Sequence, residues 1–260
     1  MVKVGLSTLF CLGKPFSKLL KNLHRFDVSC IEVVDDGGHS LNARRVDALR
    51  RAISPLDVEL TIHAPFADIN IASLNPAIRR ISLRRLEKSI LAAERLSCRL
   101  WVFHPGLGTG LGYFYPGAEW ERNLESIRHL CRFGEEHGVR VAVENCPEPF
   151  PFLMRRVEDF TRFYNELGNN YDVGMVLDVG HAHISGQIHE FLERFQHRIV
   201  HIHVSDNDGR FDAHMGIGQG TINWRGVADA IKKINYRGAV VLESVTQVKE
   251  SLKTLRELFG

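Results

Sequence analysis

Residues 199–220 read Ile-Val-His-Ile-His-Val-Ser-Asp-Asn-Asp-Gly-Arg-Phe-Asp-Ala-His-Met-Gly-Ile-Gly-Gln-Gly. The stretch begins as an apolar, β-branched run, which is the composition of a buried parallel strand. It then changes abruptly into acids, histidines and glycines. A strand that ends in a loop of polar ligand groups is typical of an active site in an α/β barrel. His203, Asp212 and His214 offer imidazole nitrogen and carboxylate oxygen, donors that suit zinc or manganese.

The same design repeats along the chain, where short apolar runs alternate with longer amphipathic segments. Eight such pairs in 260 residues predict an α/β fold, a single (β/α)8 TIM barrel, because a barrel of this kind takes about 250 residues. We expect one domain, 1–260. The expected strands are 2–7, 30–34, 59–62, 100–103, 140–143, 174–177, 200–204 and 239–242. The expected helices are 15–25, 42–53, 76–96, 119–137, 157–167, 187–195, 224–234 and 247–258. A doubly wound open sheet is the main alternative, but its Gly-x-Gly-x-x-Gly after the first strand is absent.

The composition limits the classes of function. Apolar residues make up 44% of the chain and charged residues 25%, as in an ordinary soluble globular protein. A net charge of +2 argues against a strongly basic nucleic-acid face. The five cysteines form no Cys-x-x-Cys pair, so we expect reduced thiols and a cytoplasmic protein. We expect no signal peptide and no membrane span, and the sequence leaves a homo-oligomer open.

Acidic and imidazole side chains stand at the end of one predicted strand after another. Strand ends in a barrel converge on one mouth, so we expect these side chains to share one pocket. Carboxylates and imidazoles crowded there would repel or be poorly solvated without a cation, and a divalent metal ion resolves that. The nine residues are His63, His104, Glu144, Asp178, His181, His203, Asp212, His214 and Glu243.

Other polar and aromatic residues have simpler explanations. His201 points the same way as His203 and could line the barrel interior, but we do not count it as a ligand. The glycine-rich run 216–220 is a weak phosphate motif. Loops after the seventh and eighth strands often bind phosphate in barrels, so a phosphorylated substrate stays open. Five aromatic residues could cover a sugar ring or simply pack in loops: Tyr113, Phe114, Tyr115, Phe150 and Phe152.

The strand ends resemble those of the xylose-isomerase-like TIM barrel superfamily, which contains sugar phosphate isomerases and epimerases as well as AP endonuclease family 2, the endonuclease IV-like enzymes. The resemblance covers essentially the whole chain. Its motifs are Ile62-His-Ala-Pro65, Phe103-His-Pro-Gly106, Val143-Glu-Asn145, Leu177-Asp-Val-Gly-His181, His203-Val-Ser-Asp206, Asp212-Ala-His214 and Leu242-Glu-Ser244.

The resemblance to the sugar isomerases and epimerases implies one manganese, cobalt or magnesium ion, with a sugar or sugar phosphate as substrate. Its ligands would be Glu144, Asp178, His203 and Glu243. Glu144 and Glu243 would also be the catalytic residues that move a proton through a metal-stabilised enediolate. His181 would bind a substrate oxygen, and His63 and His104 are further candidates for substrate binding.

The resemblance to endonuclease IV implies a different enzyme, a zinc-dependent hydrolase that cuts DNA at abasic sites. All nine strand-end residues then match the ligands of a three-zinc cluster. DNA is a partner only under this alternative. The enzyme would need basic, wedge-forming loops that hold bent DNA. The connection from 181 to 200 is short and the overall charge is near balance, so we rank the isomerase or epimerase first.

Overall fold

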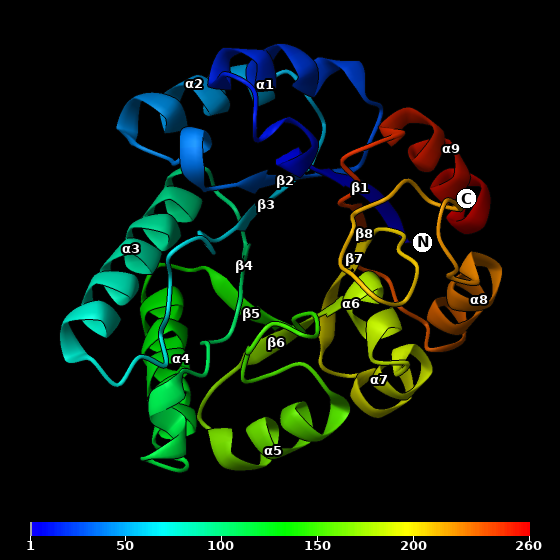
Figure 1. Ribbon diagram of the computed structural model, residues 1–260. Coiled ribbons are helices and arrows are strands. Elements are labelled where there is room, and N and C mark those ends of the chain that lie inside the picture. Colours follow the sequence, from blue (N-terminus) through cyan, green and yellow to red (C-terminus); the bar gives the residue numbers. More distant parts are fainter. Residues whose placement is uncertain (1) are drawn as a thin grey trace.

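The strands form a closed parallel barrel in which each strand pairs with the next in the sequence and β8 pairs with β1. The computed structural model describes residues 2–260, and Figure 1 shows the ring of strands with helices around it. The predicted (β/α)8 TIM barrel is therefore confirmed. The strands are β1 Lys3–Ser7, β2 Cys30–Val34, β3 Glu59–His63, β4 Leu100–Phe103, β5 Arg140–Glu144, β6 Val173–Asp178, β7 Ile199–Val204 and β8 Ala239–Leu242.

The helices follow the predicted ranges to within one or two residues at most ends. They are α1 Phe16–Asn22, α2 Ala43–Ile53, α3 Pro76–Arg95, α4 Ala118–Glu136, α5 Val157–Leu167, α6 Val179–Ile184, α7 Ile188–Phe195, α8 Trp224–Lys233 and α9 Val248–Phe259. The predicted helix 15–25 is divided into α1 and a 3-10 turn, Leu23–Arg25. Helix α6 was not predicted, because six residues are too few to show a helical period.

Each strand presents its residues alternately to the helices and to the barrel interior. Side chains such as Ile62, Trp101 and Ile202 belong to the large core between strands and helices. The other set of strand residues forms two small separate apolar clusters inside the barrel. Their members are Cys30, Ala239 and Val241 in one cluster and Val102, Ala142 and Val176 in the other.

The interior set becomes polar toward the carboxyl ends of the strands. Glu144 stands two positions after Ala142 on β5, and Asp178 stands two positions after Val176 on β6. Glu243 stands two positions after Val241, just beyond the end of β8. Apolar side chains thus fill one end of the barrel, and ionisable groups occupy the other end, where the loops that lead into the helices begin. Within residues 2–260, no helix combines the length and the apolar character needed to cross a membrane.

Close packing of the loop after β4 depends on Gly106. A Cβ atom built at this position would lie 2.6 Å from the backbone nitrogen of Ala72 and would also overlap the Ala72 side chain. The Gly106 backbone N–H donates a 2.8 Å hydrogen bond to Asn123 Oδ1, so the loop cannot easily move away.

We therefore expect Gly106→Ala to lower the free energy of unfolding by about 1–3 kcal/mol, the usual cost of overpacking. Urea unfolding followed by circular dichroism measures the change. Gly110→Ala is the matched control, because a Cβ there meets no atom within 4 Å. Equal stability of the two variants would contradict the packing described for this loop.

Candidate metal centre and active site

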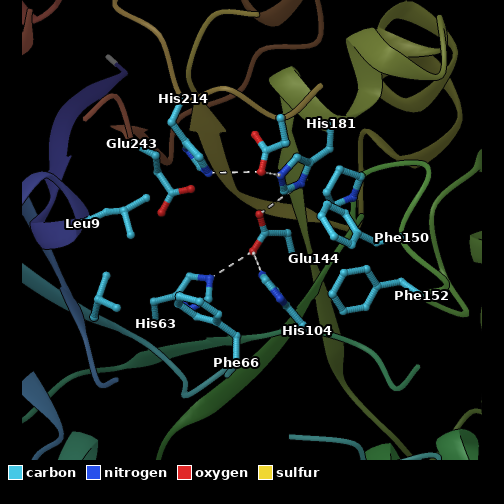
Figure 2. A pocket seen from close by; sticks show the side chains of 13 residues that line it. Leu9, His63, Phe66, His104, Glu144, Phe150, Phe152, His181, His214 and Glu243 are labelled. Carbon is cyan, nitrogen blue, oxygen red and sulfur yellow. Dashed lines mark hydrogen bonds and ion pairs between the residues drawn. The ribbon is translucent and has the colours of Figure 1, made fainter. Parts of the chain in front are cut away.

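Glu144, the last residue of β5, is the centre of the site. Its side chain is 1% exposed, and its Oε2 atom lies 3.3 Å from Nε2 of both His63 and His104. Its Oε1 atom lies 3.1 Å from Nδ1 of His203. In Figure 2 the dashed lines run from the Glu144 carboxylate to His63 and His104 on one side and toward His181 on the other. One carboxylate therefore contacts imidazoles from the β3, β4, β6 and β7 regions of the barrel mouth.

A second group forms around the same carboxylate. The ligand atoms of Glu144, Asp178, His203 and Glu243 all lie within 4.8 Å of one another. His203 Nδ1 lies 3.5 Å from Glu243 Oε2. Asp178 Oδ1 accepts a 2.7 Å hydrogen bond from the backbone N–H of His181 and so caps helix α6. The other oxygen, Asp178 Oδ2, is buried without a hydrogen-bond partner.

The third group brings the loop after β7 against helix α6. Asp212 Oδ2 lies 3.2 Å from His181 Nε2 and 3.1 Å from His214 Nε2. His181 Nδ1 lies 2.8 Å from the backbone oxygen of Asn145. Since Nδ1 must donate to that carbonyl oxygen, Nε2 is the nitrogen left to face Asp212.

Burial and mutual charge strongly perturb these groups. Burial opposes the charge on Glu144, but His203 and hydrogen bonds from the surrounding histidines outweigh it and hold its pKa well below the ordinary range. Burial, together with the nearby Glu144 and Glu243 carboxylates, raises the pKa of Asp178 to about 7. Burial alone would lower the pKa of His181, but Asp178 and Asp212 raise it to about 10. The charged form of each buried carboxylate therefore depends on how close it lies to the imidazoles that the carboxylates share.

The residues present fit divalent metal ions. They offer carboxylate oxygen and imidazole nitrogen, and five of the buried donor or acceptor atoms of the nine residues have no hydrogen-bond partner within residues 2–260. Those atoms are Asp178 Oδ2, His104 Nδ1, His203 Nε2, Asp212 Oδ1 and His214 Nδ1. Asp178 Oδ2 belongs to the four-residue group, so a cation at that group would give a buried oxygen its missing partner.

A cavity of about 260 Å³ opens above the ionisable groups. Its remaining wall is apolar, and Figure 2 shows Phe66, Phe150 and Phe152 around it, with Leu9 on the side of Glu243. Phe66 is held in place because Asp36 Oδ2 accepts hydrogen bonds of 2.8 Å from the backbone N–H groups of residues 66 and 67. The aromatic residues Tyr113, Phe114 and Tyr115 are exposed and are not among the lining residues.

All nine strand-end residues predicted from the sequence come together in the three groups. Seven of them line the cavity, whereas Asp178 and His203 lie beneath it, 0% exposed. Their assignment to metal binding and catalysis stays a prediction.

Sequence reasoning missed two buried polar residues. Asn145 accepts a hydrogen bond from the backbone N–H of Asp178 and donates one to its carbonyl oxygen, which ties the ends of β5 and β6 together. Glu32, in β2, lies against His201 and His203. A charged residue within the apolar run 30–34 was the signal that could have identified it.

The chain matches one family model and is similar to several known proteins. The family model described as "Xylose isomerase-like TIM barrel" matches residues 20–258. A solved structure, of a D-tagatose 3-epimerase-like protein, superposes with a TM-score of 0.92 at 27% identity, over 99% of this chain and 97% of the other. An uncharacterised protein of Methanocaldococcus jannaschii is 31% identical over 99% of both chains.

Two further relatives have named activities. The D-psicose 3-epimerase of Ruminiclostridium cellulolyticum is 22% identical over 82% of this chain and 74% of its own. The probable endonuclease 4 of Halothermothrix orenii is 24% identical over 66% of each chain. Relatives of both chemical classes are therefore similar to this chain.

We expect Asp178→Asn to weaken binding of a divalent metal ion by at least about 10–100-fold, the loss typical of residues that only support ligands. The substitution keeps the shape of the side chain but removes the charge of a buried oxygen that has no other partner. Isothermal titration of the metal-free protein with Mn²⁺, Co²⁺ or Zn²⁺ measures the affinity. Asp208→Asn, at an exposed position in the loop after β7, should bind like the unmodified protein. Unchanged affinity in Asp178→Asn would contradict the assignment of this residue.

Proposed function

Because the chain belongs to the xylose isomerase-like TIM barrel family, we propose that it is a divalent-metal-dependent epimerase or isomerase of a small sugar. One observation carries the proposal: Glu144 and Glu243 converge with Asp178 and His203 at the floor of a small cavity. The named sugar 3-epimerase among the relatives and the 3-epimerase-like structure support the same class of reaction.

Glu144, Asp178, His203 and Glu243 would hold the metal ion. When bound, the ion would stabilise negative charge that develops on a sugar carbonyl oxygen. Glu144 and Glu243 would flank the carbon next to the carbonyl group, and one carboxylate would take its proton while the other acid returns a proton. Return to the opposite face of the carbon inverts its configuration, whereas return to the neighbouring carbon isomerises the sugar.

The remaining residues of the cavity would bind and enclose the substrate. His181, which the Asn145 carbonyl oxygen orients, would contact a substrate oxygen. His63 and His104 lie on the other side of Glu144 and would contact a second oxygen of the substrate. Phe66, together with the other apolar side chains of the wall, would exclude water, which protects a carbanion-like species from unspecific protonation.

The size and lining of the cavity favour an unphosphorylated sugar. Its volume of about 260 Å³ is just below the range of roughly 300–1,000 Å³ for drug-sized ligands, so it suits a monosaccharide. Among the described residues that line it there is no lysine or arginine, the side chains that most often bind phosphate.

A metal-loaded sample incubated with ketoses in deuterated water should incorporate deuterium at the carbon next to the carbonyl group. Glu243→Gln should abolish the exchange, because an amide cannot take up the proton. Mass spectrometry and proton NMR measure the exchange, and the free ketose should react faster than its phosphate. Glu119→Gln, which alters a buried glutamate away from the metal groups, should keep it. Absence of exchange across a panel of ketoses and their phosphates would count against the proposal.

An endonuclease IV-like enzyme is the second candidate, and a specific observation favours it. The nine strand-end residues divide into three groups. Glu144 belongs to two of these groups, and every other residue belongs to one. They are His63, His104 and Glu144; Glu144, Asp178, His203 and Glu243; and His181, Asp212 and His214. This division corresponds to the three-zinc cluster that the resemblance to endonuclease IV implies.

Metal content and DNA cleavage distinguish the two candidates. The sugar enzyme needs one exchangeable metal ion per chain, whereas the nuclease needs about three zinc ions and should incise a duplex with an abasic site. Elemental analysis and a gel assay of incision measure both properties. Incision that Glu144→Gln abolishes would reverse the ranking of the two functions, and an uncleaved duplex together with sugar exchange would support the sugar enzyme as the first candidate.

A further inference from the structure

Glu32 is a buried carboxylate for which the proposed epimerase or isomerase reaction has no use. It lies in the middle of β2 on the interior face of the barrel, between Cys30 and Val34, and its side chain is 0% exposed. Glu32 does not line the cavity, so it cannot contact a substrate there.

The contacts of Glu32 lead directly to the metal groups. Its Oε1 lies 2.9 Å from Nε2 of His203, and its Oε2 lies 3.1 Å from Nε2 of His201. Glu32 Oε1, His201 Nε2 and His203 Nε2 make no hydrogen bond within residues 2–260, so these two contacts are ion pairs by distance. Thr61, on the neighbouring strand β3, donates a 3.1 Å hydrogen bond from its hydroxyl group to Oε2. Glu32 is therefore held from β3 and faces two imidazoles of β7.

The two nitrogens of the His203 ring face different carboxylates. Nδ1 lies 3.1 Å from Glu144 and 3.5 Å from Glu243, on the side of the metal groups. Nε2 faces Glu32 on the opposite side. A neutral imidazole can bind a metal ion only through a nitrogen that carries no proton, and the partner of the other nitrogen decides which one that is.

A carboxylate buried so deeply is destabilising unless nearby groups compensate its charge. On the basis of the proposed metal-dependent function, we propose that Glu32 is a positioning residue for His203. It keeps the proton on Nε2 and holds the ring so that the free Nδ1 points at the group formed with Glu144, Asp178 and Glu243. The hydroxyl group of Thr61 in turn fixes the carboxylate of Glu32 through its hydrogen bond.

Replacement of Glu32 by glutamine tests this role with little change of volume. Glu32→Gln should bind Co²⁺ about 10–100-fold more weakly, the loss typical when a residue that orients a metal ligand is removed. Titration calorimetry measures the affinity, and the visible absorption of bound Co²⁺ reports a change in the ligand field that a general loss of stability does not produce.

Glu119→Gln is the matched control, because Glu119 is also a buried glutamate that accepts hydrogen bonds but lies at the start of α4, away from His203. Equal Co²⁺ affinity in Glu32→Gln and the unmodified protein would overturn the proposal, and so would an equal loss in both variants. A metal ion found between Glu32, His201 and His203 would also overturn it.

A pair of substitutions at Thr61 extends the test if Glu32→Gln fails to fold. Thr61→Val removes the hydroxyl group that holds Glu32, at nearly constant volume, and should weaken Co²⁺ binding in the same direction but less. Thr61→Ser keeps the hydroxyl group and should restore the affinity. Identical affinities of the two variants would contradict the chain of contacts from Thr61 through Glu32 to His203.

Imidazole NMR of the metal-free protein separates this proposal from the proposed function. Long-range ¹H–¹⁵N correlations should show a slowly exchanging Nε2 proton on His203 in the unmodified protein and in Glu119→Gln, and its loss in Glu32→Gln. If the protein bound no metal but this proton behaved as expected, the proposed function would fail and the role of Glu32 would stand. An Nε2 proton unchanged in Glu32→Gln would overturn that role even if metal binds.

Discussion

The burial of several carboxylates at one mouth of the barrel is the constraint on which the site depends. Glu144, Asp178 and Glu243 come from separate strands and converge within a few ångströms, almost completely shielded from water. Such charges are tolerated in a protein interior only when opposite charges or metal ions compensate them. The histidines supply that compensation in the protein alone, and a bound divalent cation would add to it. The barrel makes the convergence unavoidable, because its parallel strands all end at the same rim.

The loops are built to keep these groups in place. Asp206, buried after β7, accepts hydrogen bonds from the backbone N–H groups of Gly218 and Ile222 and from the indole of Trp224. These bonds close the loop that carries Asp212 and His214 into a fixed arc. Asn145 likewise joins the ends of β5 and β6 through its two hydrogen bonds with the backbone of Asp178. A metal centre with its ligands positioned before binding loses less affinity to the ordering of side chains.

The relatives of this chain include a D-psicose 3-epimerase and a probable endonuclease 4, whose names give two different chemistries. The shared fold therefore cannot assign the reaction alone. What differs is the surrounding wall. In this protein apolar side chains, including Phe66, Phe150 and Phe152, line a cavity of about 260 Å³. A wall of this kind suits a small neutral molecule, and it is the structural reason that sugar chemistry ranks above phosphodiester hydrolysis.

The sequence by itself determined the barrel and the membership of the strand-end set, because alternation of apolar runs with helical segments and the repeated placement of acids and histidines are properties of order along the chain. Only the tertiary structure decided how those residues divide into three groups, since that depends on where the loop with Asp212 and His214 folds back. It also decided that Glu32 stands behind His203, because β2 and β7 are neighbours only across the interior of a closed barrel. Local spacing in the sequence carries no information about contacts made across that interior. The partner of a single glutamate in an apolar strand is therefore known only from the closed barrel.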